Sequence, residues 1–460
     1  MSETEKRIDA SELDGLPPRQ QVIAMVTIAI SLTLALLDSA VANVALPMIA
    51  VDMHSGASTA IWVVNGYQLA LAVCLLPFAT LGEKHGYRTV YKAGLMLFTL
   101  SSLACAFSHS MLALTLSRVL QGVGAAGIMS VNTALVRYIV PRSRLGSAIG
   151  INAMVAGTAA TLGPTVAGAI LSVASWPWLF VINVPLGLVA MALARRNLPD
   201  NDRSMRSFDL AGALLGALSI GMLITSVESL GHGMKWQAVV AQLVICVVAG
   251  TLLIRKESRI ALPQFPFDLL RIPVFALSLC TSVGAFAAQM MAYVALPFFL
   301  HGSLGYPPAM VGLLMTPWPL LTGLVAPIAG RLSDRVSPGL LGGIGLAALS
   351  TGLVCLAWMP ETPRPFDIAW RMMLCGAGFG LFQSPNNRTI IGAAPKSRSG
   401  AASGMLGTAR LTGQSLGTAL VALALGALQL QGVLPGLLCA AVLAGCACVI
   451  SLLRIRSQRG

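Results

Sequence analysis

Asp38 is a single carboxylate in the middle of the first long apolar run of the chain, residues 21–50. A charged side chain at membrane depth is costly to keep, so such a residue usually marks a path for protons, ions or substrate. A carboxylate there can carry a proton when its surroundings bring its proton affinity close to neutral pH. The alternative role is structural, with Asp38 holding helices together by a hydrogen bond to Asn43 or to a neighbouring backbone group.

Two arginines also lie inside apolar runs. Arg118 falls within 112–136, and a fixed positive charge near Asp38 would favour the ionised carboxylate and so tune it. Alternatively, the long side chain of Arg118 reaches a carbonyl group or the membrane surface. Arg410 lies within 400–427. It could contact an anionic group of a substrate or a carbonyl oxygen at a helix end.

Membrane-spanning helices must position these charges. Hydrophobic residues make up 56% of the chain, charged residues only 10%, and the mean hydropathy is +0.79, values that exclude an ordinary soluble domain. A spanning helix needs roughly twenty mainly apolar residues. Fourteen such runs occur, at 21–50, 59–80, 90–108, 112–136, 146–172, 178–194, 208–228, 236–254, 273–300, 308–330, 339–358, 366–387, 400–427 and 432–453. The predicted fold class is an all-α polytopic membrane protein.

The basic residues predict how these helices are oriented, because Lys and Arg concentrate in cytoplasmic loops. With both termini in the cytoplasm, most of the 30 basic residues fall in the termini and the even-numbered loops. The net charge of +13 is then explained by topology and by attraction to anionic membrane lipids. No nucleic-acid partner is expected.

An internal repeat divides the chain into two halves. Residues 141–150 recur as 395–404, and at the same offset Gly122 is matched by Gly376. The run pair 208–254 has no counterpart, so we interpret it as an insertion. The predicted organisation is a cytoplasmic tail 1–20, an N-terminal six-helix bundle 21–195, an inserted helix pair with its loops 196–272, a C-terminal six-helix bundle 273–454 and a tail 455–460. Parallel six-helix repeats are typical of transporters that expose one site alternately to each side.

Six motifs follow one another along nearly the whole chain. They are Leu37-Asp38 with Asn43-Val-Ala-Leu-Pro47, Trp62 with Tyr67, Ala79-Thr-Leu-Gly-Glu-Lys-His-Gly86 with Arg88, Leu116-Ser-Arg118 with Gln121-Gly122-x-Gly124, Gly157 to Gly163-Pro164 with Ala167-Gly168, and Trp176-Pro-Trp178 before Asn183-Val-Pro185. In this order they resemble the major facilitator superfamily, specifically its fourteen-helix drug:proton antiporter branch. Three positions depart from the pattern: Ala79 replaces a glycine, Glu83 an aspartate and Pro177 an arginine. The first two keep the shape and charge of their loop, whereas Pro177 leaves the outer end of the sixth helix unexplained.

The resemblance implies a hinge and a gating loop. The hinge of the antiporter motif would be Gly157, Gly163, Pro164 and Gly168, although small residues there also permit ordinary close packing. The loop would join the two halves by charge pairing; its residues are Glu83, Lys84, Gly86 and Arg88, with Asp334 and Arg335 as the corresponding set in the second half. The alternative is that the loop charges only set the topology.

Polar, aromatic and methionine side chains on several runs are candidates to line a substrate cavity. They are Asn43, Trp62, Tyr67, Gln289, Met290, Phe382, Gln383 and Asn386, with the reservation that methionine stripes more often form core. Asp209 and Glu228, near the two ends of the seventh run, are possible second acids for coupling. Helix ends tolerate charge at little cost, so an interfacial role is the alternative for both.

Absent motifs narrow the function. The sequence has no Gly-x-x-x-x-Gly-Lys-Ser/Thr phosphate loop and no catalytic or metal-ligand cluster at membrane depth, so we expect neither an enzyme nor a cofactor or metal. The predicted function is a proton-coupled antiporter that exports amphipathic, chiefly cationic, drugs or toxic compounds, is driven by the proton gradient and works as a monomer in a bacterial inner membrane. The alternatives are a dedicated exporter of one endogenous metabolite or siderophore, and a non-transporting membrane sensor or scaffold.

Overall fold

The structure is a computed structural model that describes residues 15–141, 144–200, 209–231, 234–258, 267–333, 335–360, 363–394, 399–428 and 433–457. Within these ranges every regular element is helical. In chain order the elements are α1 (Pro18–Asp52), α2 (Ala57–Ala60), α3 (Trp62–His85), α4 (Tyr87–Ala106), α5 (Met111–Ile139), α6 (Leu145–Val173), α7 (Trp178–Val181), α8 (Asn183–Asn197), α9 (Leu210–Gly231), α10 (Trp236–Glu257), the 3-10 turn η3 (Phe267–Arg271), α11 (Pro273–Phe298), the π-helical turn η4 (Phe299–Ser303), α12 (Pro308–Met315), α13 (Pro317–Leu332), α14 (Pro338–Ala357), α15 (Pro365–Ala393), α16 (Ser399–Leu428) and α17 (Val433–Ser457).

The fourteen apolar runs correspond to these helices. Each run lies, to within two residues at its ends, in one helix or in two consecutive ones. Thirteen segments among the described residues are long and apolar enough to cross a membrane. The remaining run lies in α15, a 29-residue helix that carries Asp367, Arg371 and Arg388 and packs against α13 and α14. The predicted all-α polytopic fold is confirmed.

Prolines explain two of the places where a spanning segment is interrupted. Pro317 begins α13 directly after α12, and Pro297 lies one residue before the end of α11, where the π-helical turn η4 takes over. Proline lacks the backbone N–H that would continue the helix and its ring crowds the preceding turn, so the backbone bends or changes its hydrogen-bond spacing there.

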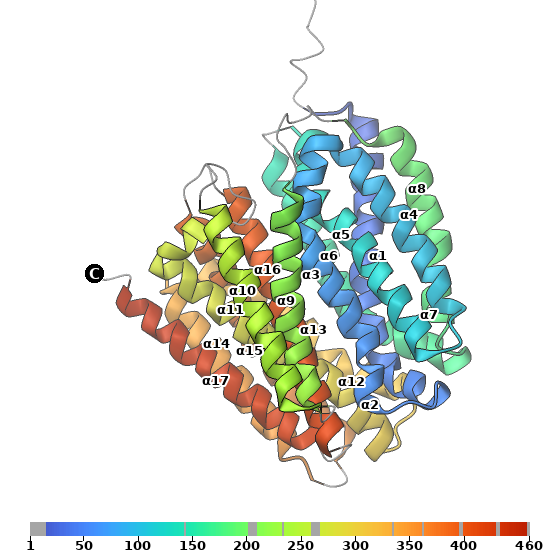
Figure 1. Cartoon of the computed structure of the whole chain (residues 1–460), viewed down its shortest axis with the longest axis vertical. Helices are drawn as coiled ribbons and strands as arrows, with labels where there is room; N and C mark the ends of the chain where they lie inside the picture. The colour runs from blue at the N-terminus through green and yellow to red at the C-terminus, as the bar shows by residue number, and fades with distance from the viewer. Residues whose placement is uncertain are drawn as a thin grey trace, which may run out of the picture.

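The two halves stand side by side in Figure 1, with the blue-to-green helices α1–α8 on one side and the yellow-to-red helices α11–α17 on the other. The inserted helices α9 and α10 pack against each other, and α9 also contacts α3 of the first half and α16 of the second. The inserted pair therefore covers one side of the interface between the halves.

The repeat is visible in how the helices approach one another. A methyl group at Gly122 of α5 would overlap the backbone carbonyl of Tyr67 on α3, and one at Gly376 of α15 would overlap the carbonyl of Trp318 on α13. Both positions need glycine for this close approach. The two halves thus use the same helix contact at equivalent positions.

The main contacts that join the halves are those of α1 with α11, of α3 with α16, and of α6 with α12 and α13. Basic residues gather at one end of the molecule, in the last turns of α3, α8 and α10. We call this the basic end; the positive-inside rule predicts that it faces the cytoplasm.

Candidate functional site

Asp38 of α1 and Arg118 of α5 form an ion pair in the centre of the N-terminal half. Their side chains are 1% and 0% exposed, respectively. The guanidinium Nη1 of Arg118 donates a hydrogen bond to Oδ2 of Asp38. The structure thus brings together the two embedded charges that the sequence analysis linked, although 80 residues separate them in the chain.

Two amide side chains complete the surroundings of the carboxylate. Oδ1 of Asp38 accepts hydrogen bonds from Nε2 of Gln121 at 2.9 Å and from Nδ2 of Asn183 at 2.7 Å. Asn183 is the first residue of α8, so Asp38 joins α1 to both α5 and α8. Asn43, the alternative partner considered above, instead donates to the carbonyl oxygen of Ser39 at 3.2 Å.

Arg118 is held from several sides as well. Its Nε donates to the carbonyl oxygen of Val63 at 2.9 Å, and Nη1 also donates to Oε1 of Gln121 at 2.6 Å. The guanidinium carbon lies 4.4 Å from the centre of the Tyr67 ring and 5.5 Å from that of Phe180. Tyr67, a candidate for the substrate cavity, therefore belongs to the charge-pair cluster, and its hydroxyl donates to the carbonyl oxygen of Ala35 at 2.9 Å.

Gln121, Asn183 and Ser102 are the members of this cluster to which the sequence analysis gave no role. Gln121 and Asn183 stand inside recognised motifs, so the motifs contained a signal. Ser102 of α4, whose Oγ accepts from Nε2 of Gln121 at 2.7 Å, has no such signal, because one serine among the many in apolar helices looks like any other.

The network depends on both of its charges. A buried ion pair is stable only while both charges are present, because removing one leaves the other without compensation in a medium of low polarity. Protonation of Asp38 would leave the cation of Arg118 in that position. Loss of either charge would therefore disfavour this arrangement of α1, α5 and α8.

The antiporter-motif residues lie where α6 meets its neighbours. A methyl group at Gly163 would overlap the side chain of Ala40 on α1, whereas one at Gly168 would lie 3.1 Å from backbone atoms of Pro308 and Ala309 in the other half. The carbonyl of Pro164, in turn, lies against Gly312 of α12.

The hydroxyl groups of Thr165 and Thr316 are 2.6 Å apart across the same α6–α12 contact. Gly157 differs, because a methyl group there would meet no atom within 4 Å. Three of the four hinge candidates are thus at close contacts, and one faces open space.

The predicted gating loop forms the turn from α3 to α4. Gly86 has a φ of +99°, a conformation that favours glycine. Arg88 lies 3.6 Å from Oδ2 of Asp200 and donates to the carbonyl oxygen of Arg195. In this conformation Arg88 binds the end of α8 in its own half. Of the corresponding set in the second half, Asp334 lies outside the described residues, and Arg335 is exposed.

The two possible second acids belong to α9. Asp209 precedes the helix, accepts a hydrogen bond from the amide of Gly212 at 2.9 Å, and forms an ion pair with Lys256 of α10. Partial burial raises the pKa of Asp209, but the hydrogen bonds from Lys256 and Gly212 outweigh this effect and bring the pKa below its usual value. The side chain of Glu228 lies outside the described part of the chain.

The cavity candidates divide into two groups. Trp62, Gln289 and Gln383 are partly exposed. Met290 is buried, and its sulfur lies 3.6 Å from Nε2 of Gln68 on α3, at the contact between the halves. Phe382 and Asn386 differ from the expectation, because both are 0% exposed. They face the interior of the C-terminal half, where the Phe382 ring packs at 6.0 Å from that of Phe379.

Asn386 belongs to a second buried polar cluster that the sequence analysis missed. Nη1 of Arg454 on α17 donates to Oδ1 of Asn386 at 2.6 Å and to Oγ of Ser278 at 2.7 Å, and Nδ2 of Asn386 donates to Oγ of Ser282 at 2.8 Å. Arg454 is 0% exposed. No carboxylate pairs with it among the described residues.

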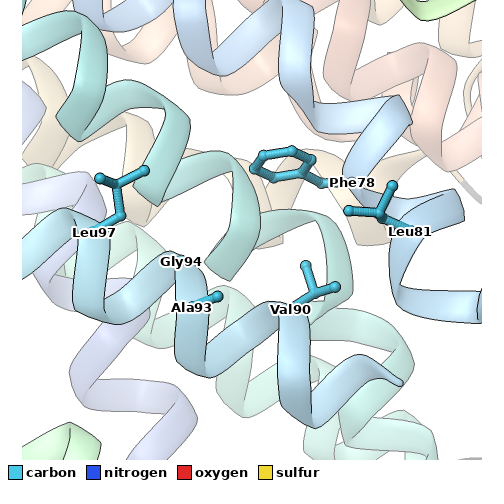
Figure 2. Close-up of a pocket in the computed structure, with 6 residues that line it drawn as sticks. All are labelled: Phe78, Leu81, Val90, Ala93, Gly94 and Leu97. Carbon is cyan, nitrogen blue, oxygen red and sulfur yellow. The ribbon is translucent and has the colours of Figure 1, made fainter. Parts of the chain in front are cut away.

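A small crevice between α3 and α4 is entirely apolar. Figure 2 shows its lining side chains, which are Phe78, Leu81, Val90, Ala93, Gly94 and Leu97. Its volume of about 130 Å³ is below the roughly 300–1,000 Å³ typical of ligand pockets, and it offers no polar group to orient a ligand. We do not assign it to substrate.

Two duplicated six-helix bundles, joined along an interface and carrying a buried ion pair, define a multi-pass membrane transporter. The comparisons identify its family. A model described as Major Facilitator Superfamily matches residues 28–418. The chain belongs to this superfamily, as the motif resemblance indicated, and its members are transporters rather than enzymes.

Similar proteins come from several bacteria. The chain is 52% identical over 450 residues to the uncharacterized transporter YebQ of Escherichia coli K12, covering 97% of this chain and 98% of that one. It is 31% identical to the riboflavin transporter RibZ of Clostridioides difficile, covering 87% of each chain. It is also 31% identical to the multidrug resistance protein Stp of Mycobacterium tuberculosis, covering 89% of this chain and 76% of that one.

A solved structure supports the fold. A POT family transporter, crystallised with a thioalcohol-conjugated peptide, superposes with a TM-score of 0.71, 15% identity and coverage of 96% of each chain.

Proposed function

We propose that this protein is a proton-driven exporter that exchanges protons for amphipathic small molecules across a bacterial inner membrane, with the basic end in the cytoplasm. The observation that carries the proposal is the sealed carboxylate of Asp38, which is bound by side chains from two other helices, α5 and α8. A carboxylate at membrane depth is costly and is usually kept for a function. Here the function would be that protonation of Asp38 changes how the helices bound to it associate. The proton gradient then supplies the energy, without a cofactor, and one chain contains both halves of the path.

The mechanism assigns each group a role. With Asp38 ionised, Arg118, Gln121 and Asn183 hold α1, α5 and α8 together. Proton uptake removes the charge that Arg118 needs, so a second arrangement, in which Asp38 is reachable and Arg118 finds other acceptors, gains in relative stability. The close contact of α6 at Gly168 with Pro308 and Ala309 of the other half lies where the halves would have to slide or tilt.

Exported drugs and toxic compounds are the substrate range we propose, supported by the similarity to the multidrug resistance protein Stp. The similarity to the riboflavin transporter RibZ over 87% of each chain favours a second candidate, a dedicated exporter of one metabolite. A competition profile separates the two. Inhibition of transport by many unrelated amphipathic compounds supports the first, and inhibition by one compound and its near analogues supports the second.

The test measures proton movement in proteoliposomes that carry a pH-sensitive dye. A panel of lipophilic cations, anions and neutral compounds is added to the native protein, to Asp38→Asn and to Asp52→Asn. Asp52 is the matched control, because it lies at the end of the same helix and its Oδ2 accepts from Trp176 at 2.8 Å, a bond that an asparagine oxygen can preserve.

We expect compound-dependent proton movement for the native protein and for Asp52→Asn, and none for Asp38→Asn. Equal proton movement in the native protein and Asp38→Asn would contradict the role of Asp38. No proton movement with any compound, together with transport of a labelled one, would contradict proton coupling.

A further inference from the structure

We propose that Arg410 is the binding site for a negatively charged oxygen group, such as a carboxylate, on the transported molecule. The inference rests on the proposed transport function and adds the charge of the substrate. It differs from the sequence-based expectation of chiefly cationic compounds. A cation would need a free acid, and the carboxylate of Asp38 is already paired with Arg118 and buried.

Arg410 lies deep in the membrane-spanning part of the molecule. It is eleven residues beyond Ser399, the first residue of α16, which corresponds to roughly 16 Å at 1.5 Å per residue. Half the thickness of the hydrocarbon core is about 15 Å. An arginine at this depth is retained only for a pairing or a function.

The neighbouring residues of α16 show which way Arg410 points. Gly413 and Gly417 face α11, where added methyl groups would touch Val283 and Ala287, whereas Leu411 packs in the cluster that includes Leu71 of α3. At 100° per residue, Arg410 falls between these two faces. Its guanidinium carbon lies 5.5 Å from the ring centre of Phe286 on α11. The side chain therefore points between α11 and α3, which belong to different halves.

No partner in the described structure neutralises Arg410. Its Nε is buried without a hydrogen bond, and no ion pair of Arg410 occurs among the described residues. Arg118 and Arg371 have carboxylate partners, and Arg454 has two hydrogen bonds from one nitrogen. Arg118, Arg371 and Arg454 also keep unpaired nitrogens, but each of them already donates to an oxygen acceptor, and no such bond occurs for Arg410 among the described residues.

The surroundings suit a carboxylate attached to an apolar or aromatic body. The planar guanidinium matches the two oxygens of a carboxylate, and the Phe286 ring beside it, which packs against that of Phe379, makes the surroundings apolar. One turn further from the basic end on α11, Met290 contacts Gln68 of α3 at 3.6 Å. The halves therefore touch just beyond the proposed site, on the side away from the basic end.

The test is binding of three probes with one aromatic skeleton: naphthaleneacetate, naphthaleneacetamide and naphthylethylammonium. Affinities are measured by titration calorimetry with the purified full-length protein in phosphatidylcholine nanodiscs, whose lipid carries no net charge. The proteins are the native chain, Arg410→Gln, Arg410→Lys and, as a matched control, Arg454→Gln, which removes the other buried arginine without a carboxylate partner. Size-exclusion profiles check that each variant is folded.

We expect the native protein to bind the carboxylate at least about tenfold more tightly than the amide, because a hydrogen bond to a charged group contributes roughly 1.5–3 kcal/mol. Arg410→Gln should remove this preference and improve binding of the ammonium probe, Arg410→Lys should keep part of the preference, and Arg454→Gln should keep all of it.

The proposal is overturned if the native protein shows no preference for the carboxylate, or if Arg410→Gln retains that preference. Binding requires no transport, so the outcome is separate from that of the proposed function. Preference for the anion without proton-coupled transport contradicts only the proposed function, and proton-coupled transport without anion preference contradicts only the site at Arg410.

Discussion

The two halves share a fold but differ in their buried polar clusters. Around Arg118 the N-terminal half has an acid, Asp38, with two amide side chains, whereas around Arg454 the C-terminal half has Ser278 and Asn386, which do not ionise. A proton can change the charge of the first cluster and not of the second. The same six-helix fold thus occurs twice, and of the two clusters only that of the N-terminal half contains a carboxylate.

The internal alignment supports this contrast position by position. Val44-Ala-Leu-Pro47 of α1 recurs as Val294-Ala-Leu-Pro297 of α11, which places Ala288 at the position of Asp38. The offset that matches Gly122 with Gly376 places Met372 at the position of Arg118. Ala288 and Met372 are 0% and 1% exposed. Where the first half has an ion pair, the second has apolar packing.

The largest expected effect comes from removing one partner of the ion pair. Arg118→Met leaves the carboxylate of Asp38 buried without its counter-charge, so we expect the free energy of unfolding to fall by about 3–5 kcal/mol. The double variant Asp38→Ala with Arg118→Met copies the C-terminal half and should recover most of this loss while lacking proton coupling. Reversible unfolding in mixed detergent micelles measures both.

Arg371→Met serves as the control for this comparison. Arg371 pairs with Asp367 one turn away, at side-chain exposures of 13% and 38%, and a partly solvated pair of this kind contributes at most about 1 kcal/mol. If the double variant were no more stable than Arg118→Met, the loss would come from packing around Arg118, and the ion pair would not be the cause.

Hydropathy and charge predicted where the helices lie, because helix positions depend on composition along the chain. The partners of Asp38 were harder to predict from the sequence. Arg118 and Asn183 stand 80 and 145 residues away in the chain. The charge of Arg118 inside an apolar run indicated its importance, whereas Asn183 had only its place in a recognised motif. Ser102 carried no signal of any kind.

The sequence analysis erred mainly in predicting which face of its helix a residue lies on. Phe382 and Asn386 were expected to line a cavity, yet both face the interior of their own half. In a helix that is apolar all round, hydrophobic periodicity does not separate the side facing a cavity from the side facing a neighbouring helix. Arg454 was missed for a related reason, because a basic residue just after an apolar run looks like a loop residue.

A smaller effect is expected at the Arg454 cluster of the C-terminal half. Arg454→Met removes two hydrogen bonds and leaves Oδ1 of Asn386 without its donor, which should cost about 1–3 kcal/mol of unfolding free energy. The removed cation has no carboxylate partner, so no buried charge is left behind, and proton coupling should be unchanged. Unfolding and proton movement are measured on the same preparation.

Arg454→Lys is the matched variant, because it keeps the positive charge and one hydrogen-bond donor and should lie between the native protein and Arg454→Met in stability. Loss of proton coupling in Arg454→Met, with the fold intact, would remove the contrast between the halves and make both clusters part of the coupling machinery.

The smallest effect is expected at the third charge pair, Asp209 with Lys256 at the basic end of the inserted helices. Their side chains are 21% and 36% exposed, so solvent screens the pair and Asp209→Asn should cost less than about 1 kcal/mol of unfolding free energy. The pKa of Asp209 is lowered in the folded protein. A lowered pKa adds stability above the unfolded value of about 3.9 and loses it as the pH falls through the folded value.

The difference in unfolding free energy between the native protein and Asp209→Asn should therefore be constant from about pH 5 to pH 8 and should shrink only below about pH 4. Denaturant unfolding across this range measures it, with Asp52→Asn as the control for loss of an interfacial acid. A difference that changes near neutral pH would mean that Asp209 gains and loses its proton in the range where the transporter works. Titration in that range would then not be confined to the centre of the N-terminal half, and the inserted pair would have to be counted as a second proton-sensitive element.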